Sequence, residues 1–191
     1  MTQVTVEPMQ GESYVVRPNQ FSWGVITINE ATGLFMAYTD YGNFSYHWPA
    51  PGDKGLKHFL GTIEFDYAMG KLSANRGDRF DADVGIHNLR KRIKEERRDG
   101  VIERVTARCA WLEVDDIEAE ALGENSQLFY DRIWRSSHIL DAIGHDDWHR
   151  NINGRVKCPQ CVGFWNNIFI PFVASYMPDH KLKPVSTEAL I

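Results

Sequence analysis

The sequence predicts an α+β fold in which an N-terminal antiparallel β-meander packs against a set of C-terminal helices. Up to residue 50, short runs of β-branched and aromatic residues alternate with turn residues, which is typical of strands. From residue 51 onward, apolar residues recur every three or four positions, which is typical of helices. A chain of 191 residues, 43% hydrophobic and 25% charged, has the length and composition of one folded domain.

We divide this predicted single domain, residues 1–191, into four segments. They are a loose leader at 1–12, the meander at 13–50, a helical part at 51–177 and a flexible tail at 178–191. The predicted strands are SYVVR, FSWGVITIN, GLFMAYTD and FSYHW, and the turn NEATG supplies a glycine for a hairpin. Neighbouring strands joined by such short turns form an antiparallel meander.

The predicted helices are marked by apolar stripes and by caps. The stripes are Leu56, Phe59, Leu60 and Ile63; Ile86, Leu89 and Ile93; Val105, Cys109 and Leu112; Phe129, Ile133 and Leu140; and Phe164, Trp165, Ile168, Phe169, Phe172 and Val173. Asp81 or Asp83 can cap the helix that ends at Gly100, and Asn125 can cap a later one. Pro171 lies inside the last stripe and predicts a kink or an early stop.

The stretch TDYGNFSYHWP, residues 39–49, is unusually aromatic. At the period of two that strands have, Phe44, Tyr46 and Trp48 share one face. One interpretation buries them together with a parallel alternation on the previous strand, which consists of Leu34, Met36 and Tyr38. The other leaves Tyr46 and Trp48 exposed as anchors for a partner, because tyrosine and tryptophan are favoured at binding hot spots.

Two charged blocks of opposite sign follow each other in the helical part. The basic block lies in the predicted helix at 86–99 and contains Arg90, Lys91, Lys94, Arg97 and Arg98. The acidic block contains Glu113, Asp115, Asp116, Glu118 and Glu120. Each block can simply be a solvated helix face. Together they predict a dipolar surface that binds a charged macromolecule, although the net charge of −5 argues against a general polyanion binder.

A cluster of histidine and cysteine residues precedes the last predicted helix. His145, His149, Cys158 and Cys161 follow the spacing H-x3-H-x8-C-x2-C, which can supply four tetrahedral ligands to one structural zinc ion. In the alternative, Cys161 packs into the last helix and the histidines lie in a polar loop. A Cys-x-x-Cys redox pair is disfavoured because no βαβ pattern surrounds the cysteines.

Signatures of common enzymes are missing from the sequence. It has no phosphate-binding loop, no dinucleotide-binding glycine pattern and no nucleophile elbow, so we predict a non-enzymatic protein without a cofactor, or with one structural zinc. The first residues do not form a signal peptide, and the longest apolar block is interrupted by Asn166, Asn167 and Pro171. We therefore expect a cytoplasmic protein with no membrane partner.

Three segments carry a resemblance to known proteins. They are YGNFSYHW at 41–48, LKHFL at 56–60, and the pair Asp66-Tyr67 with Gly70-Lys71-Leu72. This series resembles small, uncharacterised accessory proteins encoded in tailed-phage and prophage genomes, which share a Y-G-x-x-S-Y-x-W, F-L and D-Y-x-x-G-K-L pattern. The resemblance implies a role in the host cytoplasm, in anti-CRISPR or other anti-defence functions, but it transfers no site residue.

These observations lead to one preferred function and two alternatives. The preferred function is a phage or prophage binding protein that inhibits a bacterial defence complex, either a protein or a ribonucleoprotein, through its charged patches. The first alternative is a nucleic-acid-binding accessory protein that uses the basic helix at 86–99. The second is a zinc-dependent enzyme built on the cluster at 145–161.

Overall fold

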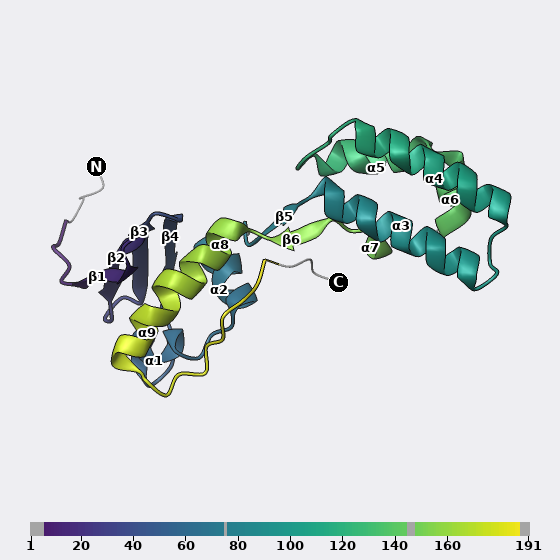
Figure 1. Ribbon diagram of the computed structural model, residues 1–191. Helices are drawn as coiled ribbons and strands as arrows, with labels where there is room; N and C mark the ends of the chain where they lie inside the picture. Colours follow the sequence, from purple (N-terminus) through teal and green to yellow (C-terminus); the bar gives the residue numbers. More distant parts are fainter. Residues whose placement is uncertain (1–5, 75, 145–147, 188–191) are drawn as a thin grey trace, which may run out of the picture. The chain divides into compact units, whose positions relative to one another are not determined.

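The chain divides into two compact units, which are described separately. The computed structural model describes residues 6–74, 76–144 and 148–187 (Figure 1). Unit 1 contains the described residues up to Gly77 and the segment Cys158–Thr187, and unit 2 contains Asp78–Lys157. The predicted helical part is thus shared between the units, and the single domain stays a prediction.

The predicted β-meander is confirmed in unit 1, and with it the α+β class. Its described part is an antiparallel sheet in the order β1 (Glu12–Asn19), β2 (Ser22–Asn29), β3 (Leu34–Thr39) and β4 (Gly42–His47). Gly33 closes the β2–β3 hairpin with φ +77°, and a Cβ there would lie 1.8 Å from the Trp48 carbonyl oxygen. Only glycine fits this turn.

The predicted face of β3 is wrong by one residue. Strand pairing places Phe35 opposite Tyr46 and Ala37 opposite Phe44, so the inner face of β3 carries Phe35 and Ala37. Met36 and Tyr38 point outward and are 49% and 61% exposed. The reason is that Leu34–Thr39 has apolar residues at both alternations, so only the register set by the turn decides which face is buried.

Helices cover the inner face of the sheet. They are α1 (Gly55–Leu60), α2 (Phe65–Leu72) and the consecutive helical segments α8 (Pro159–Phe164), η1 (Trp165–Phe169) and α9 (Ile170–Tyr176) (Figure 1). The rings of Phe44 and Phe164 stack at 3.9 Å between centroids, and Phe169 meets Phe35 edge-on at 5.9 Å. Each buried phenylalanine contributes about 1.5–3 kcal/mol to folding. This aromatic packing explains why the last stripe predicted from the sequence is so dense.

Pro171 does not end the last helix. The preceding segment η1 is π-helical, and the Ile170 amide donates to the Trp165 carbonyl five residues earlier. Pro171 then falls in the first turn of α9. The π turn shifts the backbone hydrogen bonds just before the proline from a spacing of four residues to five. Pro171 has no amide hydrogen to donate, but the helix continues after it. The expected early stop is therefore wrong.

The segment after α9 is held against the helix, although it has no helix or strand in its described residues 178–187. The Asn166 side chain donates to the Val185 carbonyl at 2.7 Å and accepts from the Val185 amide at 2.9 Å. The Trp165 indole donates to the Lys183 carbonyl at 2.9 Å. The predicted flexible tail is thus anchored as far as Val185 by side chains of the π-helical turn.

Unit 2 is mainly helical. Its elements are β5 (Asp78–Phe80), α3 (Ala82–Arg98), α4 (Arg104–Ala119), α5 (Ser126–Arg135), α6 (Ser137–Ile143), α7 (Trp148–Asn151) and β6 (Arg155–Lys157), and β5 pairs with β6 in antiparallel fashion. The predicted caps are confirmed, because Asp81 accepts from the amides of Asp83 and Val84, and Asn125 accepts from that of Leu128.

The buried stripe of α4 differs from the predicted one. α4 packs against α3 and α6 through Ala110, Val114 and Ile117, whereas Val105 and Leu112 are 69% and 57% exposed. The sequence offers apolar residues on two sides of this helix, and neighbouring helices select only one of them. The other side is an exposed apolar surface. None of the helices in the described part of the chain has the length and apolar character needed to cross a membrane.

Candidate partner-binding groove

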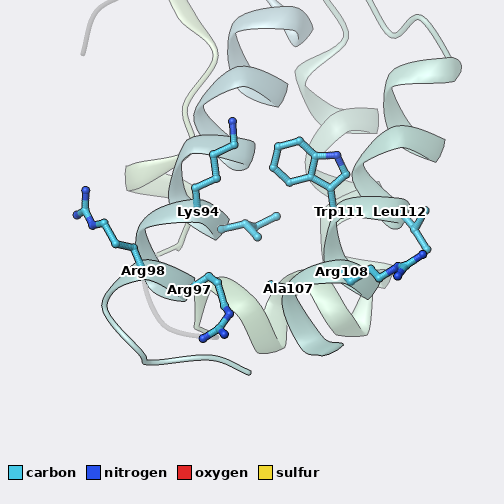
Figure 2. Close-up of a pocket in the computed structure, with 8 residues that line it drawn as sticks. Lys94, Arg97, Arg98, Ala107, Arg108, Trp111 and Leu112 are labelled. Carbon is cyan, nitrogen blue, oxygen red and sulfur yellow. The ribbon is translucent and has the colours of Figure 1, made fainter. Parts of the chain in front are cut away.

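A groove lies between the C-terminal half of α3 and the N-terminal half of α4. It has a volume of about 510 Å³ and is lined by Ile93, Lys94, Arg97, Arg98, Ala107, Arg108, Trp111 and Leu112, which we call the α3–α4 groove (Figure 2). Ile93 is buried, while Leu112 is 57% exposed. The lining is therefore apolar inside and cationic at its edges, where the lysine and arginine head groups extend outward.

Trp111 is the aromatic centre of this surface. In Figure 2 its indole extends from α4 toward α3, and the Lys94 side chain runs beside it. The Lys94 ammonium lies 5.0 Å from the ring centroid and the Arg90 guanidinium 5.3 Å from it. Cation–π contacts of this kind contribute about 0.5–1 kcal/mol at exposed sites. The two cations thus fix the orientation of the ring.

Arg90 is neutralised within unit 2. Its guanidinium lies 2.5 Å from a carboxylate oxygen of Asp115 and 2.7 Å from one of Glu118. The hydrogen bond with Glu118, followed by that with Asp115, raises the pKa of Arg90. The same hydrogen bond from Arg90 lowers the pKa of Glu118. Arg90 therefore joins α3 to α4 and offers little charge to a partner.

Three cations of the groove have no carboxylate at ion-pair distance among the described residues. The Lys94 ammonium lies over the Trp111 ring, Arg97 donates weakly to the Ile102 carbonyl at 3.4 Å, and Arg108 has no polar contact in the described part of unit 2. Arg98 is held by the adjacent Asp99 at 3.0 Å, and both side chains are exposed. Lys94 and Arg97 of the basic block thus present their charge at the groove, while Lys91 is exposed outside it.

Most of the acidic block contacts side chains of unit 2. Besides Asp115 and Glu118, Glu120 pairs with Arg132 at 2.9 Å, and Glu113 contacts the His138 ring at 2.6 Å. Glu113 also accepts a hydrogen bond from the Ile139 amide in the first turn of α6. The packing of α3 and α6 on α4 brings these partners together. The structure therefore places one cationic groove beside an acidic helix in which Asp115 and Glu118 share Arg90 and Glu120 pairs with Arg132.

The predicted aromatic anchors belong to unit 1. Trp48 is only 5% exposed, lies in the core and donates from its indole to the Tyr67 hydroxyl at 3.2 Å. Tyr46 is half-buried, and the Lys71 ammonium lies 5.4 Å from its ring centroid. Trp48 is therefore a core residue and cannot act as a surface anchor, which corrects that interpretation.

The described zinc ligands predicted from the sequence belong to different units of the chain. His145 lies outside the described residues, His149 is exposed in α7 of unit 2, and both cysteines belong to unit 1. Among the residues that the structure describes, no three histidine, cysteine, aspartate or glutamate side chains are grouped closely enough to hold a metal ion. The zinc site stays a prediction.

The groove residues of α4 were not predicted from the sequence. Ala107, Arg108, Trp111 and Leu112 recur at helical spacing on one side of α4, and they form a second apolar stripe interrupted by a cation. That second stripe is the feature of the sequence from which these groove residues could be predicted. The predicted stripe contained Leu112 but was assigned to the core, so the surface role was missed.

The comparisons with known proteins give one match. The model of the family Phage_phiTE_072, described as a phage family, matches residues 5–177, which is most of the chain. Neither the curated proteins nor the solved structures contain a match.

Proposed function

Because the chain belongs to a phage family, we propose that it is a phage-encoded binding protein that inhibits a bacterial defence complex of the host, with the α3–α4 groove as its binding surface. The observation that supports this most is an apolar groove bordered by Lys94, Arg97 and Arg108, which have no carboxylate partner among the described residues of unit 2. The partner would be a host protein or ribonucleoprotein, and the protein acts on it by occupying a surface.

The chemistry of the groove favours a protein segment as the bound group. Ile93, Trp111 and Leu112 offer apolar contacts, and Lys94 and Arg108 lie at the edges, where they can meet carboxylates. An amphipathic helix with an apolar stripe and flanking acidic residues matches both features, which is a common mode of recognition. Burial of the apolar stripe supplies affinity, and the cations orient the segment and speed its association.

Single-stranded nucleic acid is a second candidate, favoured by one specific observation. An indole beside unpaired cations, as Trp111 lies beside Lys94 and Arg108, is the arrangement that stacks on bases and binds phosphates in many single-strand binders. However, the inner lining of the α3–α4 groove is apolar, and nucleic-acid interfaces are usually more polar. A steep fall of affinity for a single-stranded oligonucleotide with rising salt would distinguish this candidate from protein binding.

The proposal is tested by phage challenge in bacteria that each carry one defined defence system. The protein is expressed from a plasmid, and the plating efficiency of a phage restricted by that system is measured. We expect the wild-type chain to restore plating in at least one strain, and Lys94→Glu combined with Arg108→Glu to abolish the effect. The double change reverses charge at both sides of the groove without touching the core.

The matched control is Arg135→Glu combined with Arg104→Glu, which changes the net charge equally. Both residues are exposed in unit 2 and do not line the groove. We expect this control to behave like the wild type, with all variants checked for equal expression and helix content. Plating restored equally by the groove variant, or restored in no strain, would contradict the proposal.

A further inference from the structure

Unit 1 contains a second cavity that is independent of the proposed binding function. It has a volume of about 530 Å³ and lies between strand β4, the C-terminal end of α2 and the first turn of α8. Its lining includes Cys158, Cys161, Lys71, Arg76 and the β4 residues from Gly42 to Ser45. Two of the three cysteines of the chain therefore line the same cavity.

The two cysteines lie on one turn in the sequence Cys-Pro-Gln-Cys. Cys158 is the residue that caps α8, with φ −61° and ψ 121°, and Pro159 begins the helix. Cys158 precedes the first turn of α8 and Cys161 lies within it, and a disulfide can bridge cysteines whose Cα atoms are about 5–6 Å apart. The structure holds no disulfide between the two cysteines, so the dithiol state is the one described.

The two thiols differ in accessibility. Cys158 is half-buried and reaches the cavity surface, whereas Cys161 is 3% exposed, and its Sγ donates to the Arg76 carbonyl at 3.6 Å. An accessible cysteine followed by a buried one is the arrangement of a nucleophilic and a resolving thiol. The accessible thiol reacts first with a substrate, and the buried one can reach only its neighbour.

Strand β4 gives the cavity a means of holding a substrate. In the described sheet β4 pairs with β3 alone, so one row of its backbone groups has no strand partner. Asn43 and Ser45 are exposed along this edge beside the cavity. An extended peptide can add to such an edge through main-chain hydrogen bonds and present its own side chains to the cavity.

We propose that Cys158 and Cys161 form a redox-active dithiol that reduces a disulfide carried by an extended peptide segment bound along β4. The absence of a βαβ pattern had disfavoured this role in the sequence. The structure provides the features that the chemistry needs without that pattern, namely a helical first turn, an accessible and a buried thiol, and a cavity beside an open strand edge.

The reaction proceeds by two thiol–disulfide exchanges. The Cys158 sulfur, as a thiolate, attacks one sulfur of the substrate disulfide, forms a mixed disulfide and releases the other substrate sulfur as a thiolate. The Cys161 sulfur, having lost its proton, then attacks the Cys158 sulfur, closes the Cys158–Cys161 disulfide and releases the second substrate sulfur. Two electrons pass from the protein to the substrate, and the two thiol protons end on the two product thiols.

The test uses the full chain carrying Cys109→Ser, which removes the third thiol. The probe is the aromatic disulfide dithiobis(nitrobenzoate), supplied below the protein concentration, and the released chromophore is measured. We expect each probe molecule to release both of its sulfur halves, and peptide mass analysis to find a Cys158–Cys161 disulfide. Cys161→Ser is expected to release one half only and to keep the other half bound to Cys158.

Cys158→Ser provides the second variant, and it is expected to fold because serine is a favoured capping residue. Its remaining thiol is buried, so we expect it to react about tenfold or more slowly with the probe. Circular dichroism of each variant shows whether the fold is kept. Stable probe adducts on both cysteines of the parent, with no internal disulfide, would overturn the dithiol. Retention of zinc that protects both thiols would overturn it as well.

The role of β4 is tested with a second probe. A peptide of extended sequence, with its single cysteine linked to nitrothiobenzoate, is compared with free cysteine linked to the same group. We expect the peptide to be reduced about tenfold faster, because pairing along β4 raises the local concentration of its disulfide. Equal rates for the two probes would remove β4 from the proposal, and with it the peptide substrate.

Discussion

The two units bury their cores in different ways, and the difference determines where each leaves a usable surface. Unit 1 packs a sheet against helices through stacked and edge-on aromatic rings, such as Phe44 with Phe164. Unit 2 packs helices mainly through aliphatic side chains and joins their outer faces by ion pairs, such as Arg90 with Glu118. Unit 1 leaves an open strand edge beside a pair of thiols, and unit 2 leaves a cationic groove.

Within unit 2, the cations of α3 differ in whether α4 offers them a carboxylate partner. Arg90, in the middle of α3, is close enough to two α4 carboxylates to be paired, whereas the neighbouring Lys91 is exposed. Cations at the end of α3 lie beside Ala107, Arg108 and Trp111, where α4 offers no carboxylate. The packing of α4 on α3, and not the number of charges, therefore decides that Arg90 is paired while Lys94 and Arg97 remain for a partner.

The largest expected loss of stability comes from a substitution in the aromatic core of unit 1. Phe164→Ala removes a fully buried ring that stacks on Phe44, and we expect the free energy of unfolding to fall by about 3–5 kcal/mol. Urea unfolding followed by circular dichroism measures this. The control is Phe21→Ala in the same unit, where the ring is 82% exposed, and its effect should stay within about 0.5 kcal/mol. Equal effects of the two changes would contradict the packing described for unit 1.

A smaller effect is expected from close packing in unit 2. A Cβ added at Gly85 in α3 would lie 2.7 Å from the Phe129 ring. Alanine gains about 1 kcal/mol in helix propensity over glycine. Overpacking costs about 1–3 kcal/mol, so we expect Gly85→Ala to destabilise the protein by about 1 kcal/mol.

The cause of that loss is isolated by a double-mutant cycle. In a chain that carries Phe129→Leu, the smaller side chain leaves room for the added methyl group, and we expect Gly85→Ala to become neutral or stabilising. Urea unfolding of the four chains gives the coupling energy. Additive effects would show that the ring of Phe129 does not limit the size of residue 85.

The smallest expected effect concerns the ion pair that joins α3 to α4. The hydrogen bond from Arg90 lowers the pKa of Glu118 from its usual 4.5 in the folded state. A carboxylate with a lowered folded pKa contributes stability that is fully present above its unfolded pKa. That contribution is lost as the pH falls through the folded pKa. We therefore expect Glu118→Gln to lose stability near neutral pH and to show a flatter decline in acid.

Urea midpoints measured from about pH 6 down to about pH 2 test this. The matched control is Asp116→Asn, which changes an exposed carboxylate of the same helix that has no ion pair among the described residues. Its curve should follow the wild type more closely. A Glu118→Gln curve parallel to that of the wild type would show that the pair with Arg90 does not contribute.

Much of unit 1 could be predicted from the sequence because its signals are local. The strands alternate, the hairpins have glycine where φ is positive, and the last helix carries a dense aromatic stripe. The face of β3 could not be predicted, since Phe35 and Met36 are both apolar and only the pairing with β4 distinguishes them. The π-helical turn before Pro171 has no local signal of this kind.

The groove could be predicted only in part. The cations of α3 were found because they form a run in the sequence. Their division into paired and unpaired groups depends on contacts between Arg90 and residues 25 and 28 positions later, which the α3–α4 packing creates. Trp111 and Arg108 could not be predicted for the same reason, since no feature of the sequence assigns them to a groove until α4 is placed beside α3.

Site-specific photo-crosslinking tests most directly whether the α3–α4 groove binds a host macromolecule. A photoreactive phenylalanine derivative replaces Leu112 at the groove, or Trp134 on α5 as an equally exposed control, which are 57% and 65% exposed. After irradiation of host cells that express the chain, we predict one discrete crosslinked species from position 112 that resists nuclease and is degraded by protease. The Lys94→Glu and Arg108→Glu changes should remove it. Crosslinking from position 112 that is no stronger or more discrete than from position 134 would contradict binding at the groove.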